Sequence, residues 1–237
     1  MVSSHQKRDV AGMFDDIAGS YDLLNHLLSG NIDRRWRRRA IAFLRQDPPS
    51  RILDVATGTC DLALEAMSLN PEQIVGVDIS EKMLEAGRRK VTKAGLDGII
   101  ELKVADAEEL PFETNSFDAV MVAFGVRNFS NPVKGLSEML RVLRPGGRLV
   151  VLEFTLPSNS LIRVIYRWYF HRLLPSVGRL IAKNHRAYRY LPESVDAFDK
   201  GEAFLQLLDK AGFAEKAHKK LTFGICGLYT ANKSESR

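Results

Sequence analysis

From residue 51 to residue 154, short runs of apolar residues alternate with segments of helical periodicity. Short runs bounded by turn residues are typical of buried strands, and the longer segments between most of them are typical of amphipathic helices. Strands that alternate with helices form βαβ units, so we predict an α/β fold with a doubly wound, mostly parallel sheet. The predicted strands are Arg51–Ala56, Ile74–Ile79, Ile99–Val104, Phe117–Phe124 and Arg148–Phe154, and the predicted helices are Asp61–Leu69, Ser80–Ala94 and Pro132–Leu143.

Local signals mark where several elements begin and end. Ser80 has the side chain of a helix N-cap. The sequence Arg144–Gly147 contains proline and glycine, which predicts a turn that ends one helix and starts the next strand. Gly201–Gly212 predicts a further helix that stops at its final glycine. The tail Phe213–Lys233 alternates loosely, and we predict a terminal hairpin at Thr222–Tyr229.

The excess positive charge is concentrated in one stretch of the chain. The 237 residues have a net charge of +5, yet Phe154–Pro192 contains seven basic residues and no acidic one, which leaves 27 basic against 29 acidic residues elsewhere. A local excess points to a particular surface or pocket rather than to general nucleic-acid binding. The basic residues are Arg163, Arg167, Arg172, Arg179, Lys183, Arg186 and Arg189.

Composition limits the environment that we expect. With 45% hydrophobic and 27% charged residues, the chain has an ordinary globular composition. Two cysteines are too few for a disulfide framework or a cysteine-rich zinc site, which favours a reducing compartment and no metal. The sequence shows no apolar leader and no apolar run of about 18 residues, so we expect a cytoplasmic protein without a membrane-spanning helix.

The turn after the first predicted strand, Leu53–Asp61, carries the first candidate site. It contains Gly58, and a glycine lets the backbone approach a ligand closely. Asp78 ends the second strand, 20 residues after Gly58, where an acid commonly accepts hydrogen bonds from ribose hydroxyls. Asp106 follows the third strand at the same edge of the sheet and could accept from an adenine amino group. The alternative is that both are solvated acids at strand ends.

Two cofactor classes share this geometry, dinucleotides and S-adenosylmethionine. The dinucleotide fingerprint G-x-G-x-x-G needs glycines around the pyrophosphate. This turn has only Gly58, with Ala56 and Cys60 at positions where glycines would be expected. Two acids suit a cationic sulfonium nucleoside better than a phosphorylated one, so we favour S-adenosylmethionine over NAD(P). We interpret Cys60 as a small residue in the place of a glycine, since nothing near it marks an activated thiolate.

Several segments resemble the C-methyltransferases of menaquinone and ubiquinone biosynthesis, and together they cover nearly the whole chain. Among them, Gly125–Asn128 and Tyr188–Leu191 are far more specific than the turn at Gly58. The similar segments are Tyr21–Ser29 with Trp36, Leu110–Phe112, Phe124–Asn128, Arg141–Arg148, Leu152–Phe154, Tyr188–Leu191 and Glu193–Val195.

The resemblance implies a class I methyltransferase fold, a seven-stranded sheet whose last strand is antiparallel. The chain departs from the family pattern at Thr57 and Cys60, where glycines are usual, and at Leu24 and Asp33, where methionine and histidine are usual. No catalytic role can therefore rest on a histidine at position 33. The resemblance implies that Thr59, Asp78, Asp106 and Ala107 line the S-adenosylmethionine site, and the turn adds Gly58 to the residues expected to bind the cofactor.

The implied reaction transfers a methyl group to a ring carbon of demethylmenaquinol, and 2-polyprenyl-6-methoxy-1,4-benzoquinol of the ubiquinone route is the alternative acceptor. A quinol carbon is a weak nucleophile until a phenolic proton is removed, so donors near the phenolate oxygen would help. Arg127 and Asn128 follow the fourth strand and could supply them, although Arg127 could instead cap a loop. Tyr188, Tyr190 or His185 could orient the ring or remove the proton, or they could pack in a lid, and the sequence does not identify the base.

The insertion at residues 154–198 is rich in basic and aromatic residues. On a helix at Ser160–Leu174, Arg163, Arg167 and His171 would share one face, with most apolar residues elsewhere. This pattern is typical of an interfacial helix, and a prenylated quinol is confined to the membrane. We therefore predict peripheral contact with the inner face of the membrane, and the alternative is a buried lid helix with charges at its rim.

We treat the chain, residues 1–237, as one domain without a nucleic-acid partner, and its oligomeric state is not predicted. A reductase would need the missing glycines, and a nucleic-acid methyltransferase would commonly end its fourth strand in an Asn/Asp-Pro-Pro-aromatic motif. A membrane scaffold without activity would be expected to have lost Gly58, Asp78 or Asp106. The expected parts are a helical cap at 1–49, a cofactor-binding core at 50–153, a helical lid at 154–198, and a helix and hairpin at 199–237 that complete the sheet.

Overall fold

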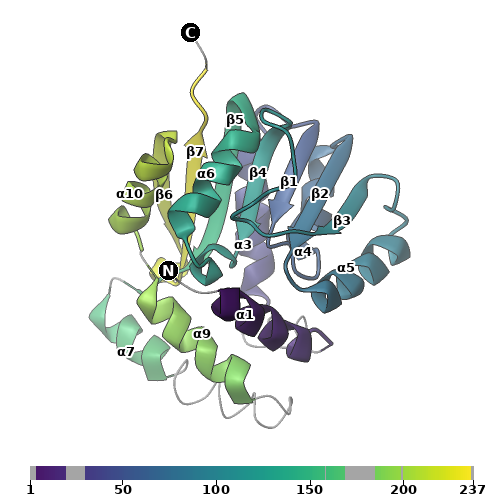
Figure 1. Cartoon of the computed structure of the whole chain (residues 1–237). Helices are drawn as coiled ribbons and strands as arrows, with labels where there is room; N and C mark the ends of the chain where they lie inside the picture. Colours follow the sequence, from purple (N-terminus) through teal and green to yellow (C-terminus); the bar gives the residue numbers. More distant parts are fainter. Residues whose placement is uncertain (1–3, 20–29, 158, 169–184, 199, 236–237) are drawn as a thin grey trace.

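A sheet of seven strands, in the order β3-β2-β1-β4-β5-β7-β6, forms the centre of the protein (Figure 1). The computed structural model describes residues 4–19, 30–157, 159–168, 185–198 and 200–235. The strands are β1 (Arg51–Val55), β2 (Gln73–Asp78), β3 (Ile100–Val104), β4 (Phe117–Ala123), β5 (Leu143–Phe154), β6 (Ala214–Leu221) and β7 (Cys226–Asn232).

The topology confirms the predicted doubly wound arrangement. Strand β1 pairs in parallel with both β2 and β4, and β3 and β5 extend the sheet in parallel. Only β7 runs antiparallel to its neighbours β5 and β6, as the resemblance implied. The chain winds outward from β1 to β3 and then returns to the other side of β1 as β4. Such a switch point leaves a crevice beyond the carboxyl ends of β1 and β4, where α/β sheets bind ligands.

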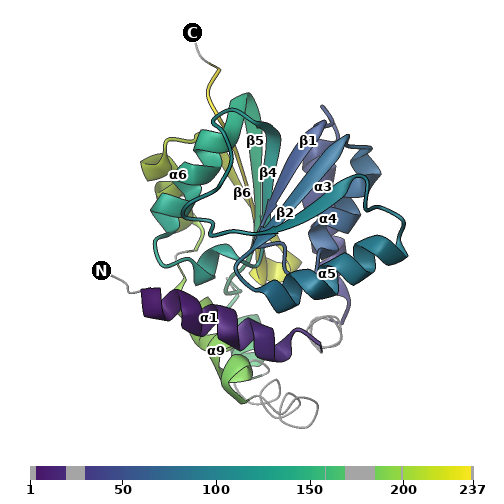
Figure 2. The ribbon, with the colours of Figure 1, turned by 45° about the vertical axis from the view of Figure 1, so that its right-hand side comes forward.

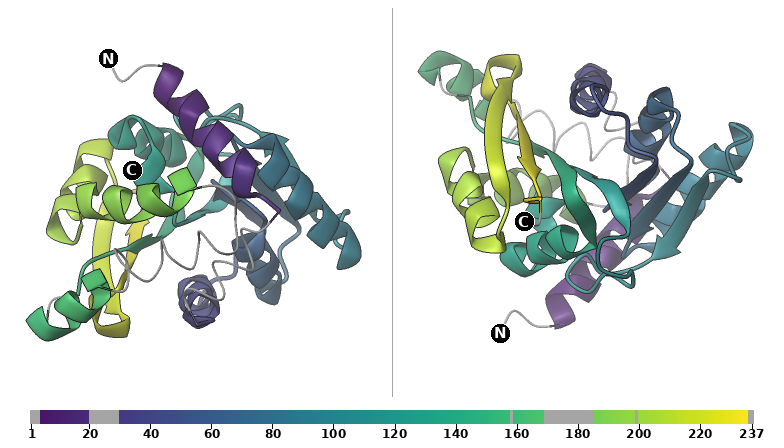
Figure 3. Two further views of the ribbon diagram at one scale, coloured as in Figure 1. Left: turned by 90° about the horizontal axis from the view of Figure 1, so that it is seen from below. Right: turned by 90° about the horizontal axis from the view of Figure 1, so that it is seen from above.

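Helices cover both faces of the sheet (Figure 3). On one face, α6 and α10 bury Leu136 and Phe204 completely. On the other face, α3 and α4 bury Leu44 and Ala63 completely. Two apolar cores therefore fix the strands between them. The longer helices are α1 (Ser4–Ile17), α3 (Ile32–Leu44), α4 (Asp61–Ala66), α5 (Glu81–Lys93), α6 (Pro132–Val142), α7 (Ser160–Trp168), α9 (His185–Ala197) and α10 (Glu202–Ala211).

Local capping explains where three of these helices begin or end. Ser80 is the predicted N-cap of α5, and its Oγ accepts a hydrogen bond of 3.2 Å from the Met83 N–H. Asn131 caps α6 in the same way, with Pro132 in the first turn. The predicted end of α10 is also confirmed, because Gly212 adopts a left-handed φ of 94°.

The prediction of a turn before β5 is wrong in its position, because the segment Arg144–Gly147 lies inside the strand. Leu143 already pairs with Phe117, and Arg148 pairs with Ala119. The four residues between them therefore bulge out opposite a single residue of β4. The apolar run alone does not reveal this, since a bulge rich in proline and glycine has the composition of a turn.

The predicted terminal hairpin is present, but it is longer than expected. Strands β6 and β7 pair from Ala214 with Asn232 to Leu221 with Cys226. Their connection is the short helical turn Thr222–Gly224, so the first strand precedes the segment in which we predicted the hairpin.

Helices α1 and α9 lie at the edge where the parallel strands end (Figure 2), and α7 lies at the same edge next to α9 (Figure 1). The insertion is helical over α7 and α9, as predicted. Among the residues described, no helix is both long and apolar enough to cross a membrane. The predictions that fall on Tyr21–Ser29, which includes Leu24, and on His171, Arg172, Arg179 and Lys183 lie outside the described residues.

Candidate cofactor and substrate site

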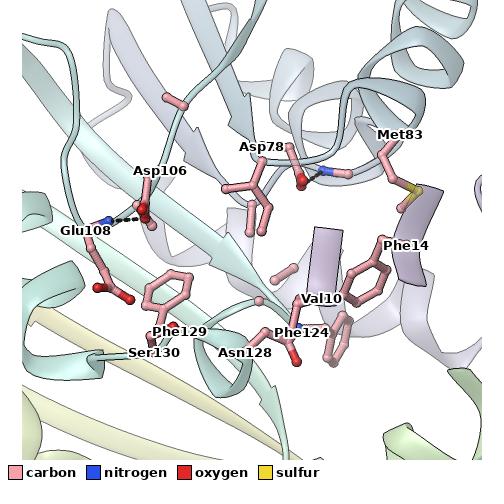
Figure 4. Close-up of a pocket in the computed structure, with 17 residues that line it drawn as sticks. Val10, Phe14, Asp78, Met83, Asp106, Glu108, Phe124, Asn128, Phe129 and Ser130 are labelled. Carbon is pink, nitrogen blue, oxygen red and sulfur yellow. Dashed lines mark hydrogen bonds between the residues drawn. The ribbon is translucent and has the colours of Figure 1, made fainter. Parts of the chain in front are cut away.

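A cleft of about 720 Å³ opens at the switch point of the sheet. Figure 4 shows Asp78 and Asp106 on one side of it, and Phe124, Asn128 and Phe129 on the other. This volume includes space that is open to solvent. The loops after β1, β2, β3 and β4 and the helix α1 contribute its walls.

The loop after β1 follows an unusual backbone path. Ala56, Gly58 and Cys60 all have positive φ angles, of 54°, 56° and 70°. For Ala56 and Cys60 this conformation costs about 1–2 kcal/mol each, since only glycine adopts it freely. Ala56 and Cys60 therefore adopt the left-handed backbone conformation that glycines usually adopt in such a loop. The neighbour Thr57 donates its hydroxyl to Asp54 Oδ2 at 2.6 Å, which fixes the loop from below.

Cys60 packs as a small side chain, in agreement with our interpretation. Its Sγ would lie 3.0 Å from a Cβ placed on Gly87, so the thiol fills the space that this glycine leaves on α5. Burial raises the pKa of the Cys60 thiol to about 12. At neutral pH the thiol is therefore protonated and is not a nucleophile.

Asp78 holds the cofactor loop to the next strand. Its Oδ2 accepts a hydrogen bond of 2.9 Å from the Gly58 N–H, and its Oδ1 accepts one of 2.9 Å from the Ser80 N–H. Burial raises the pKa of Asp78, and these backbone donors act in the opposite direction. Each carboxylate oxygen has two lone pairs, so Asp78 can still accept from a ribose hydroxyl in the cleft.

Asp106 lies on the same side of the cleft as Asp78 (Figure 4), and Ala107 also lines the cleft. The Asp106 Oδ1 accepts a hydrogen bond of 2.9 Å from the Glu108 N–H, which turns the loop after β3 around its carboxylate. Glu108 in turn accepts a bond of 2.9 Å from the Asn131 N–H, at the start of α6. Gly58, Asp78, Asp106 and Ala107 therefore all line one cleft.

Thr59 lies on the other side of the loop and lines a smaller cavity of about 390 Å³. Arg37 and Asp54 also line this cavity. The Arg37 guanidinium is 2.7 Å from Asp33 and 3.0 Å from Asp61. Asp33, where the family usually has histidine, is therefore a buried partner of an arginine. Neither Arg37 nor Asp54 could be predicted from the sequence, because an arginine in an Arg-rich helix and an acid inside a strand have no distinctive spacing.

The buried carboxyl of Asp54 tests whether the site suits S-adenosylmethionine. Its Oδ1 accepts no hydrogen bond from any residue that the structure describes. Burial raises the pKa of Asp54 to about 7, while the bond from Thr57 acts to lower it. A buried carboxylate oxygen without a hydrogen bond, in a cavity that Arg37 also lines, suits a group that carries both an ammonium and a carboxylate. The amino-acid end of S-adenosylmethionine is such a group, so the residues present fit the cofactor.

We expect the Asp54→Asn variant to change how stability depends on pH. Between its ordinary pKa of 3.8 and about 7, Asp54 is protonated in the folded protein and ionised in the unfolded chain. The free energy of unfolding should therefore fall with rising pH in this range, by up to about 1.4 kcal/mol per unit, and this contribution should level off above it. Urea unfolding at pH 5 to 8 measures this dependence, and the free energy of unfolding of the variant should lack the fall with pH. If the variant shows the same fall as wild type, the pKa of Asp54 is not raised by burial.

Helix α1 covers part of the cleft, which the sequence pattern did not predict. Val10 and Phe14 line the cleft, and Figure 4 shows Phe14 close to Met83 of α5. Asp15 on the same helix accepts a hydrogen bond of 2.6 Å from the Ser80 hydroxyl, which fastens α1 over the start of α5. The only signal in the sequence was helical spacing of apolar residues, which cannot show what the helix covers.

Of the three catalytic candidates, Asn128 lies at the cleft and Arg127 lies behind it. Asn128 lines the cleft, and its Oδ1 accepts a hydrogen bond of 3.0 Å from the Tyr190 hydroxyl. Arg127 is only 5% exposed and lies 2.7 Å from the buried Glu153. Tyr188 belongs to α9, but its side chain lies outside the described part of the structure.

Arg127 holds several elements together. Its guanidinium donates to the Phe124 carbonyl and to the Ser194 hydroxyl of α9, the latter at 3.3 Å. It also lies 5.5 Å from the centre of the Phe154 ring. These contacts support the loop-capping alternative for Arg127 and place Asn128 nearer to any ligand.

The fold is that of a class of α/β proteins that includes S-adenosylmethionine-dependent methyltransferases. Among solved structures, the cyclase SpnF matches with a TM-score of 0.69 at 19% identity, covering 96% of both chains. A SAM-dependent methyltransferase from Aquifex aeolicus matches with a TM-score of 0.56 at 20% identity, covering 78% of this chain and 82% of its own. At these identities the likeness shows the fold alone.

Sequence comparison then gives the family. The model of the ubiE/COQ5 methyltransferase family matches residues 1–233, and the chain belongs to that family. A relative from Bacteroides fragilis, named demethylmenaquinone methyltransferase, is 48% identical over 96% of this chain and 94% of its own length. A ubiquinone/menaquinone biosynthesis C-methyltransferase of Geobacter sulfurreducens is 48% identical over 94% of this chain and 88% of its own. The protein is therefore an S-adenosylmethionine-dependent methyltransferase, not a reductase.

Proposed function

We propose that the protein methylates a ring carbon of demethylmenaquinol and so produces menaquinol. The observation that carries this proposal is the likeness to relatives named demethylmenaquinone methyltransferase, at 48% identity over nearly the whole chain. The cleft supports it, because its acidic wall at Asp78 and Asp106 faces an aromatic wall that contains Phe124 and Phe129. A nucleoside and an aromatic ring could therefore lie side by side there. Methylation of the methoxy-benzoquinol of the ubiquinone route is the second candidate, since other relatives carry both names.

We assign the cofactor to the acidic wall and to the adjoining cavity. The residues assigned are Gly58, Thr59, Asp78, Asp106 and Ala107. Asp78 would accept from the ribose and Asp106 from the adenine, while Asp54 and Arg37 would face the amino-acid end. When bound, the cofactor supplies an electrophilic methyl group on a sulfonium.

The acceptor needs a developing phenolate to be stabilised while its ring carbon is aligned with the methyl group. Because the Asn128 Oδ1 already accepts from Tyr190, its amide nitrogen is the end left to donate toward the cleft. A preorganised donor at the oxygen lowers the barrier, and alignment of the two reactants can contribute about 7–11 kcal/mol more. Arg127 would act by holding Asn128 and α9 in place. Tyr188 remains a candidate for orienting the ring, on the basis of the family resemblance alone.

We also propose that the protein works in the cytoplasm and contacts the inner face of the membrane. A prenylated quinol resides in the bilayer, so the enzyme must reach its acceptor at the membrane surface. The basic stretch Phe154–Pro192 supports this proposal, since each cation near an anionic surface contributes about 1 kcal/mol.

The Asp78→Ala variant is expected to bind S-adenosylmethionine at least about tenfold more weakly. A hydrogen bond to a charged acceptor is worth roughly 1.5–3 kcal/mol, and the variant also releases the Gly58 and Ser80 amides. Calorimetry with the folded variant measures this loss. The Asp97→Ala variant, which removes an exposed acid beyond α5, is the matched control and should bind normally. Equal affinity of wild type and Asp78→Ala would remove Asp78 from the site.

The function itself is tested by quinone analysis in cells. A strain that lacks its own menaquinone methyltransferase accumulates demethylmenaquinone, and expression of this chain should restore menaquinone. A strain that lacks the ubiquinone enzyme is the parallel test of the second candidate. Mass spectrometry of the extracted quinones distinguishes the two outcomes, and restoration of neither quinone would contradict the proposed function.

A further inference from the structure

Four large apolar side chains are exposed to solvent at one corner of the molecule. On α7, Leu161, Val164 and Trp168 are 69%, 66% and 60% exposed. Their spacing of three and four residues places them on one face of the helix. Phe223, in the turn between β6 and β7, is 75% exposed. We call these four residues the apolar corner.

The turn that carries Phe223 is held firmly, although its aromatic side chain contacts so little. Thr222 and Phe223 both have positive φ angles, of 45° and 57°, which a bulky residue rarely adopts. The Thr222 hydroxyl accepts a hydrogen bond of 2.8 Å from the Trp36 indole. Thr155 donates its hydroxyl to the Gly224 carbonyl at 2.6 Å. A strained and anchored turn that presents a phenylalanine to solvent implies a function outside the fold.

Helix α7 lies beside this turn in two different views (Figures 1 and 3). Both lie at the edge where β5 ends and β7 begins, which is also the edge that holds the cleft. A ligand with a long apolar tail could therefore reach the cleft from the apolar corner without crossing the sheet.

Basic residues flank the apolar corner. Arg163 on α7 is exposed between Leu161 and Val164, and Lys219 and Lys220 are exposed where β6 enters the turn. Neither α7 nor the turn Thr222–Gly224 contains an acidic residue. Apolar side chains flanked by cations match the boundary between the acyl chains and the anionic headgroups of a bilayer.

We propose that the apolar corner inserts into the headgroup boundary of an anionic lipid bilayer and thereby brings the cleft to a membrane-held acceptor. The proposal rests on the proposed function, because a prenylated quinol is the reason to approach the bilayer. A second copy of the chain is a poorer partner. A twofold contact through this corner would bring Arg163, Lys219 and Lys220 of both copies together, and these charges repel.

Vesicle sedimentation with Phe223→Gly tests the insertion. Glycine adopts positive φ freely, so this variant should fold at least as well as wild type while losing the ring. Its affinity for vesicles of phosphatidylglycerol and phosphatidylcholine should fall by about tenfold, as expected for one aromatic side chain withdrawn from an apolar environment. Phe223→Trp should keep the affinity. Phe43→Ser, which removes a partly exposed phenylalanine from α3, is the matched control and should bind as wild type does.

Two further readouts separate this proposal from its alternatives. Methylation of a long-tailed quinol in vesicles should weaken in Phe223→Gly, whereas methylation of a short-tailed soluble quinol should not change. Three results would each overturn the insertion. Phe223→Gly could bind vesicles as well as wild type does, or wild type could fail to bind vesicles. Wild type could also form a dimer that dissociates in Phe223→Gly but not in the control. If wild type inserts through Phe223 yet methylates neither quinol, the proposed function fails and the docking surface stands.

Discussion

Replacing Glu153 with glutamine is expected to lower the free energy of unfolding by about 3–5 kcal/mol. Glu153 is completely buried at the end of β5, and its Oε1 lies 2.7 Å from the Arg127 guanidinium. Its other oxygen accepts a hydrogen bond of 3.2 Å from the Arg127 backbone N–H. Glutamine has nearly the same shape but no charge, so it would leave a buried guanidinium without its counter-ion. Urea unfolding at constant pH measures the loss.

A double replacement shows whether the lost stability comes from the unpaired charge. Arg127→Met combined with Glu153→Leu removes both charges and keeps apolar volume, so it should unfold at a higher urea concentration than Glu153→Gln alone. If Glu153→Gln is as stable as wild type, the pair does not hold the loop after β4.

The turnover of the double variant then shows which role Arg127 has in the reaction. A loss of about 10²–10³ in the turnover of a stable protein would mean that Arg127 contacts the acceptor. A smaller loss would mean that it positions Asn128, and near-normal turnover would mean that it does neither.

The strands and helices of the core could be predicted because each has its own local signal. Strand β2 is buried from Ile74 to Val77, and these four residues form a continuous apolar run in the sequence. The Ser80 cap and the final glycine of α10 depend only on a few neighbouring residues. Asp78 and Asp106 could be predicted because parallel strands bring their carboxyl ends to one edge.

The remaining parts of the site depend on contacts between distant segments. Arg127 and Glu153 are 26 residues apart, and only the pairing of β4 with β5 brings them together. The same holds for Val10 and Phe14, because a helical pattern does not show which surface a helix covers. Arginine after a strand was therefore a reasonable candidate for contact with the acceptor, but the structure turns its guanidinium toward Glu153.

Replacing Asn128 with alanine is expected to lower turnover by about 10²–10³ while leaving S-adenosylmethionine affinity nearly unchanged. Asn128 lines the cleft opposite Asp78 and Asp106, so its amide would meet the acceptor rather than the nucleoside (Figure 4). Loss of one preorganised donor at a developing oxyanion typically produces an effect of this size. Steady-state kinetics with a soluble quinol, together with calorimetric titration of the cofactor, separates kcat from binding.

The Tyr190→Phe variant is the graded control for this prediction. It keeps the Asn128 amide but removes the hydroxyl that orients it at 3.0 Å. A neutral hydrogen bond contributes about 0.5–1.5 kcal/mol, so turnover should fall by about two- to tenfold, well short of the loss in Asn128→Ala. The order of the two variants follows from their places in the structure, because one side chain would contact the acceptor and the other holds it in position. Equal losses in both variants, or near-normal turnover in Asn128→Ala, would exclude the amide as the donor to the phenolate.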